Sequence, residues 1–427
     1  MTAIKSASTR RTFMKRTAAA AGATLFTPAL ATAATKTIKI GYAGSLSGVR
    51  ANFGATENWT IAQMKKHLEN GLTLNGTTYD VELVIRDNRS EASHSATVAS
   101  DLVLRERCNL ILVQDGDAAM AIGELADTRR VPTISTMVPW QGLFFPRGGR
   151  PDVGFPYTFH FFAGSDSVLT NFGNMFDMLE TNKTVGTLFL DNPAGQGLMN
   201  PEVGLPAMLQ ARGYTEVPAG PFQITTNDFS NQVAQFRDAG TDILSGFMYD
   251  AHFVPFWNQV AQSGLTPKAC GMAAAFLFPS TVEALGDRGE GMLTEVWWTP
   301  DFPFESSVTG QTAQALATAW EDETGAQWTQ PLGYGHALWE VGLQALAEAS
   351  DPLDPDSLRD AIAGLSVDTI IGPVDFAASP VKSVAITSLA GGQWRRGSGR
   401  YPYELKVVNN DTMPQIATNA DIVPLTV

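Results

Sequence analysis

The sequence contains little of what metal sites and disulfide scaffolds require. Its 427 residues include two cysteines and five histidines, and their spacing matches no zinc or haem motif. Cys108 and Cys270 lie far apart in the chain, and each lies beside an apolar segment that predicts a buried strand. We therefore expect two separate buried thiols, with a disulfide as the alternative in an exported protein. No metal and no cofactor are predicted.

Long apolar runs and positive charge are also scarce. No stretch after the N-terminal segment reaches 18 apolar residues, so no membrane-spanning helix is predicted. Hydrophobic residues make up 44% of the chain and charged residues 17%, which is typical of a well-packed globular protein. The formal net charge of −14 excludes nucleic acids and anionic membrane surfaces as partners. A chain of this length is expected to form two domains.

The N-terminal segment is the one strongly basic part of the chain. In "STRRTFMKR", Arg10 and Arg11 precede a short, alanine-rich apolar run that ends in small residues suited to cleavage. The pattern resembles a twin-arginine export signal, with an ordinary basic leader as the alternative. We therefore expect residues 1–33 to be a signal peptide and the mature protein to be periplasmic.

Apolar strand-like runs alternate with helical patterns along most of the chain. The first series runs from "TIKIGYA" through "NWTIAQMKKHLEN" to "VPTIST", and a second begins at "KTVGTLFLDN". Such alternation predicts parallel sheets covered by helices on both faces. Three long helical patterns follow, after which "TIIGPVDF" and "VKSVAITSLAGGQWRR" predict antiparallel strands. The order indicates two α/β lobes between which the chain crosses more than once.

The loop "GYAGSLSGVRANFG" follows the first predicted strand, where parallel sheets bind ligands. It lacks the Lys and Ser/Thr of a phosphate-binding loop, and Gly41, Gly44 and Gly48 have the wrong spacing for a dinucleotide fingerprint. Ser45 and Ser47 do not form a nucleophile elbow either. We therefore expect a binding loop, not a catalytic one, in which Ser47 and backbone amides face a cleft.

An ordered series of segments carries a family resemblance. The segments are "IKIGYAGSLSGVRANFG", "VELVIRDNRSEASHSATVASDLV", "RRVPTISTMVP", "KTVGTLFLDNPAGQG", "DRGEGMLTEVWW", "IGPVDF" and "GGQW". Together they resemble the type I periplasmic solute-binding proteins of ABC importers, in particular the leucine-binding-protein-like group for branched-chain amino acids and amides. The resemblance covers nearly all of residues 36–400.

The resemblance implies an α/β fold of two Rossmann-like lobes with parallel sheets, joined by three hinge crossovers. We expect these crossovers near residues 159–163, 293–298 and 371–374. Lobe 1 then comprises residues 35–160 and 298–372, and lobe 2 comprises residues 161–297 and 373–427.

The function that the resemblance implies is the capture of a small molecule between the lobes and its delivery to an ABC permease in the inner membrane. We expect a periplasmic monomer that is not an enzyme. A bilobal sensor, which presents its closed state to a membrane receptor, is the alternative function.

By resemblance, the ligand-binding residues follow strand ends in both lobes. Lobe 1 is expected to supply Ser47, Gly116, Asp117, Ala118, Thr136, Met137, Trp140 and Tyr334. Lobe 2 is expected to supply Ala194, Tyr249, Asp250 and Met272. Trp297 and Trp298 lie at a crossover, so one of them, for which we take Trp298, is expected to line the cleft and the other to pack in the core. Tyr334 is placed just before a helix that starts near His336. Three other tryptophans lie within helical patterns and are expected in the core: Trp257, Trp320 and Trp339.

Departures from the amino-acid-binding members bear on the solute. Asp117 stands where those members offer hydroxyl groups to the α-carboxylate, and residues 272–274 lack the acid that pairs with the ammonium group. Ala194 replaces an aromatic residue that covers the ligand. We therefore expect an amino-acid-like, amide-like or aromatic solute, or a cation held by Asp117 or Asp250 with nearby Trp faces. In the alternative interpretation, backbone amides of residues 116–118 bind the solute while Asp117 and Asp250 cap helices.

Overall fold

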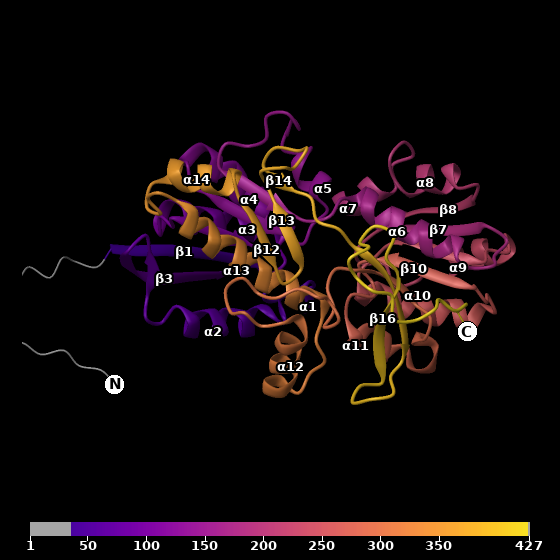
Figure 1. The fold of residues 1–427 in the computed structure, drawn as a ribbon. Coiled ribbons are helices and arrows are strands. Elements are labelled where there is room, and N and C mark those ends of the chain that lie inside the picture. Colours follow the sequence, from indigo (N-terminus) through magenta and orange to yellow (C-terminus); the bar gives the residue numbers. More distant parts are fainter. Residues whose placement is uncertain (1–35, 426–427) are drawn as a thin grey trace, which may run out of the picture. The chain divides into compact units, whose positions relative to one another are not determined.

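The structure is a computed structural model that describes residues 36–425. The predicted signal peptide lies outside these residues. From residue 36 onward the chain forms one compact unit. Figure 1 shows its sheets and the helices packed around them. We call the part built on the first seven-stranded sheet lobe 1 and the part built on the second seven-stranded sheet lobe 2.

The sheet of lobe 1 has the strand order β14-β6-β5-β4-β1-β3-β2. Its strands are parallel except for β2, which pairs with β3 in the antiparallel direction. The strands are β1 (Lys36–Gly44), β2 (Leu72–Leu74), β3 (Thr77–Asp87), β4 (Leu110–Val113), β5 (Thr133–Thr136), β6 (Thr158–Phe161) and β14 (Val384–Ala385). All four residues of β4 are buried, as expected for a central strand covered on both faces.

The sheet of lobe 2 has the order β16-β15-β11-β10-β9-β7-β8. Its first five strands along the chain are parallel, whereas β15 is antiparallel to both β11 and β16, as the C-terminal pattern predicted. The strands are β7 (Thr184–Leu190), β8 (Thr215–Phe222), β9 (Ile243–Phe247), β10 (Ala269–Ala273), β11 (Leu293–Val296), β15 (Ala390–Arg396) and β16 (Tyr403–Asn409). The predicted α/β fold of two lobes is therefore confirmed, with mixed sheets that are mostly parallel.

Helices connect the strands in both lobes. Those before β6 are α1 (Ala51–Gly54), α2 (Glu57–His67), α3 (Ala92–Ser100) with the π-helical turn η1 (Asp101–Arg105), α4 (Gly116–Arg129) and α5 (Trp140–Phe144). Those between β6 and β11 are α6 (Ser165–Asp177), α7 (Pro193–Leu198), α8 (Leu205–Ala211), α9 (Ser230–Asp238), α10 (Asp250–Ser263) and α11 (Pro279–Ala284) with the 3-10 turn η2 (Gly286–Gly289). Those after β11 are α12 (Ala313–Thr324), α13 (Gln330–Glu348) and α14 (Pro355–Ala363).

The segment "TIIGPVDF" contributes the turn and the second strand of a hairpin, in agreement with the antiparallel strands that the sequence predicted. β12 (Ser366–Thr369) and β13 (Gly372–Asp375) make a two-stranded antiparallel hairpin. The chain is still in lobe 1 after the hairpin, because β14 pairs with β6 through Val384 and His160. We therefore propose that the third crossover lies at residues 386–389, and not at 371–374, so that residues 373–385 belong to lobe 1.

Helix α13 begins earlier than the sequence pattern indicated. It starts at Gln330, so Tyr334 lies inside the helix and not before it. Pro331 stands in the first turn, where a proline has no backbone N–H to lose and its fixed φ favours helix. Nearly every residue of α13 is buried, which makes this helix a central element of the core of lobe 1.

The expected buried side chains are confirmed. Trp257 and Trp339 are fully buried and Trp320 is 7% exposed. Cys108 and Cys270 are both free and buried. Burial raises the pKa of both thiols, that of Cys108 to about 12, so neither is a reactive thiolate at neutral pH.

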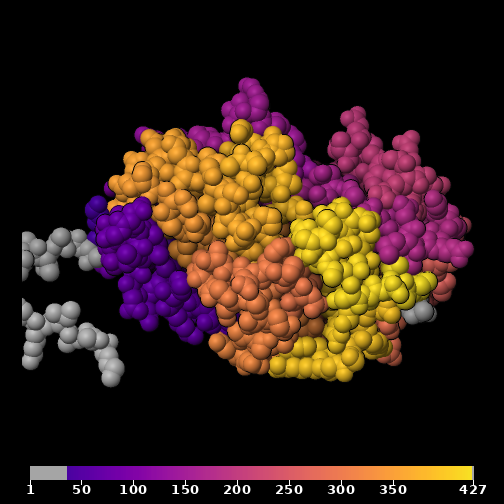
Figure 2. All heavy atoms as spheres, in the orientation of Figure 1, coloured from indigo at the N-terminus to yellow at the C-terminus, as the bar shows by residue number. Residues whose placement is uncertain are grey.

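The C-terminal segment packs across the molecule. In Figure 2 it lies, in yellow, beside the segment that carries α12, in orange. The side-chain amide of Gln327 donates to the Tyr403 carbonyl at 2.9 Å, which joins the end of α12 to β16. The backbone N–H of Leu425 donates to the Lys268 carbonyl at 2.7 Å, next to β10. The end of the described chain is thus part of lobe 2.

Candidate functional site

Loops that follow the carboxyl ends of strands in the two lobes contact one another. Asn52, in α1 after β1, donates from its side-chain amide to the carboxylate of Asp250, the first residue of α10, at 2.5 Å. The ring of Phe53 packs edge-on against Phe278, which follows β10, with centroids 5.0 Å apart. We call the region where these four residues meet the interlobe junction. In open α/β sheets the carboxyl ends of strands are where ligands bind.

Asp115 organises the lobe 1 side of the junction. Its side chain is 4% exposed and pairs with the Arg50 guanidinium, from Nε, at 2.9 Å. It also accepts hydrogen bonds from the Ser45 hydroxyl at 2.7 Å and from the Asn88 amide at 2.5 Å. The backbone N–H of Ala118 donates to it at 3.1 Å, so Asp115 is the N-cap of α4. These bonds join the loops after β1, β3 and β4.

Asp117 is a second partner of Arg50 and not the helix cap that one interpretation assigned to it. Its carboxylate lies 2.7 Å from the guanidinium, and its side chain is 38% exposed. The cap position falls on Asp115 because this residue has extended backbone and precedes the helix, whereas Asp117 lies within the first turn. Since Ala118 already donates its N–H to Asp115, that amide is not available to a solute.

The Arg50 guanidinium is affected by charged and polar side chains of both lobes. Burial would lower the pKa of Arg50, but Asp115, Asp117 and Tyr249 together raise it above its usual value. Tyr249, just before α10 in lobe 2, is half-buried. Burial raises the pKa of Tyr249, and the charges of Asp115 and Asp117 raise it further against the opposing effect of Arg50. These side chains of lobe 1 and lobe 2 therefore act on one another electrostatically.

The Ser47 side chain bonds within its own lobe, whereas the Asp250 side chain bonds to the other lobe. The Ser47 hydroxyl donates to Asp87 at 2.5 Å, so it holds its own loop to the end of β3. Burial alone would raise the pKa of Asp87, but this bond and three backbone N–H donors lower it. Asp250 is the first residue of α10 and makes no capping bond, because the helix begins at Asp250 itself and not at Ala251. Its carboxylate instead faces Asn52 of the other lobe.

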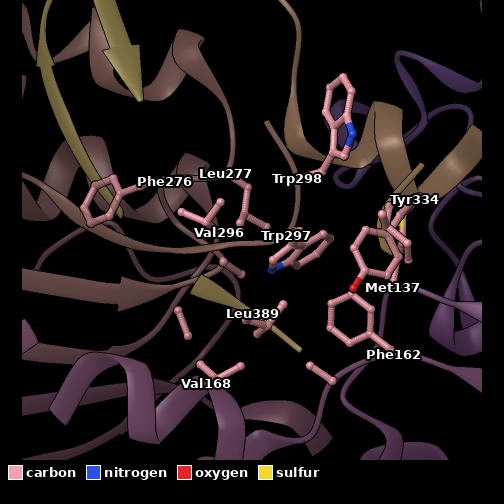
Figure 3. Close-up of a cluster of buried hydrophobic side chains, with 14 of the residues drawn as sticks. Met137, Phe162, Val168, Phe276, Leu277, Val296, Trp297, Trp298, Tyr334 and Leu389 are labelled. Atoms are coloured by element: carbon pink, nitrogen blue, oxygen red, sulfur yellow. The ribbon is translucent and has the colours of Figure 1, made fainter. Parts of the chain in front are cut away.

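Aromatic side chains fill the space beside the crossovers. Figure 3 shows Phe162, Trp297 and Tyr334 next to one another. The centroid of the Trp297 ring lies 4.8 Å from that of Phe162 and 6.1 Å from that of Phe53. The Tyr334 ring lies 5.0 Å from Phe162, and its hydroxyl is 2.8 Å from that of Thr387. We call Phe53, Phe162, Phe278, Trp297 and Tyr334 the aromatic cluster.

Trp297, and not Trp298, contacts this cluster. Trp298 is fully buried, and its ring packs against Gly333 of α13, where an added Cβ would lie 2.3 Å from the ring. It also meets Trp328 edge-on at 5.8 Å. Successive residues of an extended chain point in opposite directions, so one of the two tryptophans packs into the core of lobe 1. We therefore propose Trp297 as a site residue in place of Trp298.

Four other predicted site residues are buried within single lobes. The Thr136 hydroxyl donates to the Phe161 carbonyl at 2.7 Å, and Ala118 and Met272 are fully inaccessible. Met137 is 6% exposed and adopts a positive φ of 67° at the end of β5, where the Gln114 amide contacts its sulfur at 3.5 Å. The structure does not bring Thr136, Ala118 or Met272 to the junction. Met137 lies at the edge of the aromatic cluster in Figure 3.

The remaining predicted residues are half-buried in the first turns of helices: Gly116 in α4, Trp140 in α5 and Ala194 in α7. Trp140 is the first residue of α5 and packs against Phe144 and Phe145, with centroids 5.7 and 5.5 Å away. Ala194 lies on α7 of lobe 2, which is drawn next to α5 in Figure 1. No bond or ring contact joins these three residues to the aromatic cluster.

A small cavity lies behind Trp140. It measures about 20 Å³ and is lined in part by Phe144, Arg147 and His160. This is room for about one water molecule, so the cavity is too small for a solute. The ring nitrogens of His160 contact the Ser135 hydroxyl at 2.9 Å and the Val138 carbonyl at 2.8 Å. Burial lowers the pKa of His160 to about 4, so this histidine is a neutral structural residue.

Sequence reasoning missed several junction residues. Asn52 and Phe53 belong to the loop that was predicted to bind a ligand, but the prediction named only Ser47 and backbone amides in it. Asp115 lies two residues after the end of β4, and the pattern Asp-Gly-Asp at the start of a helix was a signal for an N-cap at its first position. The contact of Phe53 with Phe278 joins residues 225 positions apart and has no local signal.

Comparisons with known proteins establish the family and the fold of the chain. The chain belongs to the periplasmic binding protein family, which it matches over residues 37–399. It is similar in structure to a leucine binding protein from Thermotoga maritima, with 18% identity over 88% of this chain and 99% of that chain and a TM-score of 0.69.

Two further structures bear bound solutes. A branched-chain amino acid transporter substrate binding protein from Streptococcus pneumoniae, in complex with isoleucine, has 18% identity over 88% of this chain and 100% of that chain and a TM-score of 0.66. A solute binding protein of an ABC transporter from Rhodopseudomonas palustris, in complex with 3,4-dihydroxy benzoic acid, has 18% identity over 91% and 98% and a TM-score of 0.69. At this identity the likeness shows the fold, which is that of a type I periplasmic binding protein.

Residues 36–425 contain neither a helix suited to cross a membrane nor a cluster suited to hold a metal ion. None of their helices has both the length and the apolar character needed to cross a membrane. No group of three or more His, Cys, Asp or Glu side chains among them is arranged to hold a metal ion.

Proposed function

We propose that the mature protein is a periplasmic solute-binding protein that captures a small molecule at the interlobe junction and delivers it to an ABC importer. The observation that carries the proposal is the contact between loops at the carboxyl ends of both sheets, through Asn52 and Asp250 and through Phe53 and Phe278. A solute bound there would touch both lobes at once, and its binding would stabilise the closed arrangement.

The chemistry of the junction supports an amino-acid-like, amide-like or aromatic solute. Flat ring faces from the aromatic cluster provide apolar contact, and Asp117 and Asp250 provide charge and hydrogen-bond acceptors. Two proteins of the same fold are described in complex with isoleucine and with 3,4-dihydroxy benzoic acid.

Native mass spectrometry of the mature protein, purified without unfolding, tests solute binding. We expect a retained small molecule or, after its removal, a thermal shift on adding the right solute. The variant Phe53→Ala should lose this binding, because Phe53 is the ring of lobe 1 that contacts both Phe278 and Trp297. The control Leu104→Ala alters a 43% exposed side chain on η1 and should retain binding. Equal binding by both variants would contradict the placement of the site.

Delivery and export need their own tests. The solute-loaded protein should stimulate ATP hydrolysis by a reconstituted importer, whereas a sensor would leave it unchanged and would bind a membrane receptor. For export, replacing both Arg10 and Arg11 by Lys should keep the precursor in the cytoplasm, since the twin-arginine pattern is the predicted signal. Unchanged export of this variant would indicate an ordinary leader.

A further inference from the structure

Carboxylates outnumber cations at the interlobe junction. Asp115 and Asp117 follow β4, and Asp250 begins α10 after β9. Arg50 is the cation in contact with them, and it pairs with Asp115 at 2.9 Å and with Asp117 at 2.7 Å. Because two carboxylates share one guanidinium, Arg50 is not free to bind a third carboxylate from a solute.

Lobe 2 adds negative charge and no cation among these contacts. The partner of Asp250 across the junction is the neutral amide of Asn52, so the charge of Asp250 is not compensated there. On the nearby loop after β3, the exposed Arg89 stands next to Asp87, and its backbone N–H donates to that carboxylate at 2.8 Å. Because Arg89 and Asp87 carry opposite charges, they do not change the net charge near the junction, where three carboxylates stand against one guanidinium.

The aromatic cluster supplies an independent sign of a ligand. Phe53 is half-buried, and its ring touches Phe278 and Trp297 from the other side of the junction. Trp297 is 5% exposed, and its indole N–H has no acceptor among residues 36–425. The same holds for Trp257, Trp298 and Trp339, but of these four Trp297 is the one whose ring contacts Phe53 at the junction. A buried donor without a partner is costly, and a bound molecule is one way to satisfy it.

We propose that the solute is an organic cation with an aromatic ring and without a free carboxylate. This inference rests on the proposed function and concerns the same site. Its ring lies against the faces of Phe53 and Trp297, and its positive group lies beside Asp117 and Asp250. Attraction between a cation and aromatic faces adds to the ionic attraction. A carboxylate at the same place meets like charges and a guanidinium that is already paired.

Three probes that share one ring separate the charge from the shape: benzylamine, benzyl alcohol and benzoate. Isothermal titration calorimetry at low salt should show benzylamine binding at least tenfold more tightly than benzyl alcohol, with benzoate weakest. Benzoate binding as tightly as benzylamine overturns the inference, as does a protein that binds another solute but not benzylamine. Both results leave the proposed function intact. If no solute, retained or added, binds at all, the proposed function itself fails.

Isosteric variants test the named carboxylates. Asp117→Asn and Asp250→Asn each remove a charge at nearly constant volume and should weaken benzylamine at least fivefold while leaving benzyl alcohol unchanged. Asp117→Asn also frees part of the Arg50 charge, so benzoate should bind more tightly to it than to the wild type, an effect that a loss of folding would not produce. The control Asp238→Asn, in the last turn of α9 with a 70% exposed side chain, should change none of the three affinities. Unchanged benzylamine affinity in both junction variants overturns the inference.

Discussion

Arg50 and Asp115 form an ion pair between the loops after β1 and β4, with Nε and Oδ2 2.9 Å apart. The Asp115 side chain is 4% exposed, whereas the Arg50 side chain is 18% exposed. Removing the guanidinium would leave a buried carboxylate with only neutral partners, and an unpaired buried charge costs more than the pair contributes. The pair therefore fixes the lobe 1 side of the junction.

We expect Arg50→Gln to lower the free energy of unfolding by about 2–4 kcal/mol. The control Arg237→Gln removes an exposed partner of Asp238 and should cost less than about 0.5 kcal/mol. Urea unfolding followed by circular dichroism measures both. Equal effects of the two substitutions would show that the Asp115 charge is solvated in solution.

Trp297 and Trp394 are similarly buried but differ in the hydrogen bonding of their indole N–H groups. The indole N–H of Trp394 donates to the Phe276 carbonyl at 2.8 Å, whereas that of Trp297 has no acceptor among the described residues. Both side chains are at least 95% buried, so Trp→Phe removes a similar volume at each site. We expect Trp394→Phe to cost about 1–2 kcal/mol more than Trp297→Phe, because it leaves a buried carbonyl unpaired. The difference in urea midpoints gives the result, and a larger loss for Trp297→Phe would mean that its N–H has a partner.

Stability should fall with rising pH because of a buried acid. The Tyr42 hydroxyl donates to Glu57 at 2.5 Å, and burial raises the pKa of Glu57 to about 7 from an ordinary value of 4.5. Between these two values the folded chain holds a proton that the unfolded chain has lost. The stabilising contribution is thus complete below pH 4.5 and is lost as the pH rises to 7.

Glu57→Gln removes this titration and keeps the shape of the side chain. We expect the stability of the variant relative to the wild type to improve between pH 5 and pH 8. The difference between the two proteins isolates Glu57, since buried groups such as His336, whose pKa burial lowers to about 4, titrate alike in both. Thermal unfolding at the two pH values tests this, and a constant difference would contradict the raised pKa.

Gly333 and Gly197 should respond in opposite ways to alanine. An added Cβ at Gly333 of α13 would lie 2.3 Å from the Trp298 ring, whereas at Gly197 of α7 nothing lies within 4 Å. We expect Gly333→Ala to destabilise the protein by about 1–3 kcal/mol through overpacking. Gly197→Ala should stabilise it by about 0.5–1 kcal/mol, because it lowers the entropy of the unfolded chain in a helical position. Differential scanning calorimetry distinguishes the two signs.

The fold was predictable from sequence because its signals are local. Apolar runs such as the one that became β4 alternate with helical patterns, and parallel sheets follow from that alternation. The antiparallel hairpin of residues 366–375 also agrees with the pattern. The strand β14 was not predicted, because it is only two residues long, too short to carry a pattern.

The candidate site was less predictable, because its residues are defined by contacts between distant segments. Asp117 and Asp115 are two positions apart, and only the start of α4 decides which one caps it. Likewise, the choice between Trp297 and Trp298 depends on which way the chain faces as it leaves β11. A sequence pattern shows where such a pair lies along the chain but not the direction in which each side chain points.

The late position of β14, β15 and β16 in the sequence constrains how the protein is made. β14 completes the first sheet at residues 384–385, and β15 and β16 complete the second after that. A nascent chain therefore lacks an edge strand of one lobe and two strands of the other until these late segments have been synthesised. Neither sheet can be completed before that point, so the final packing of both lobes depends on the C-terminal part of the chain.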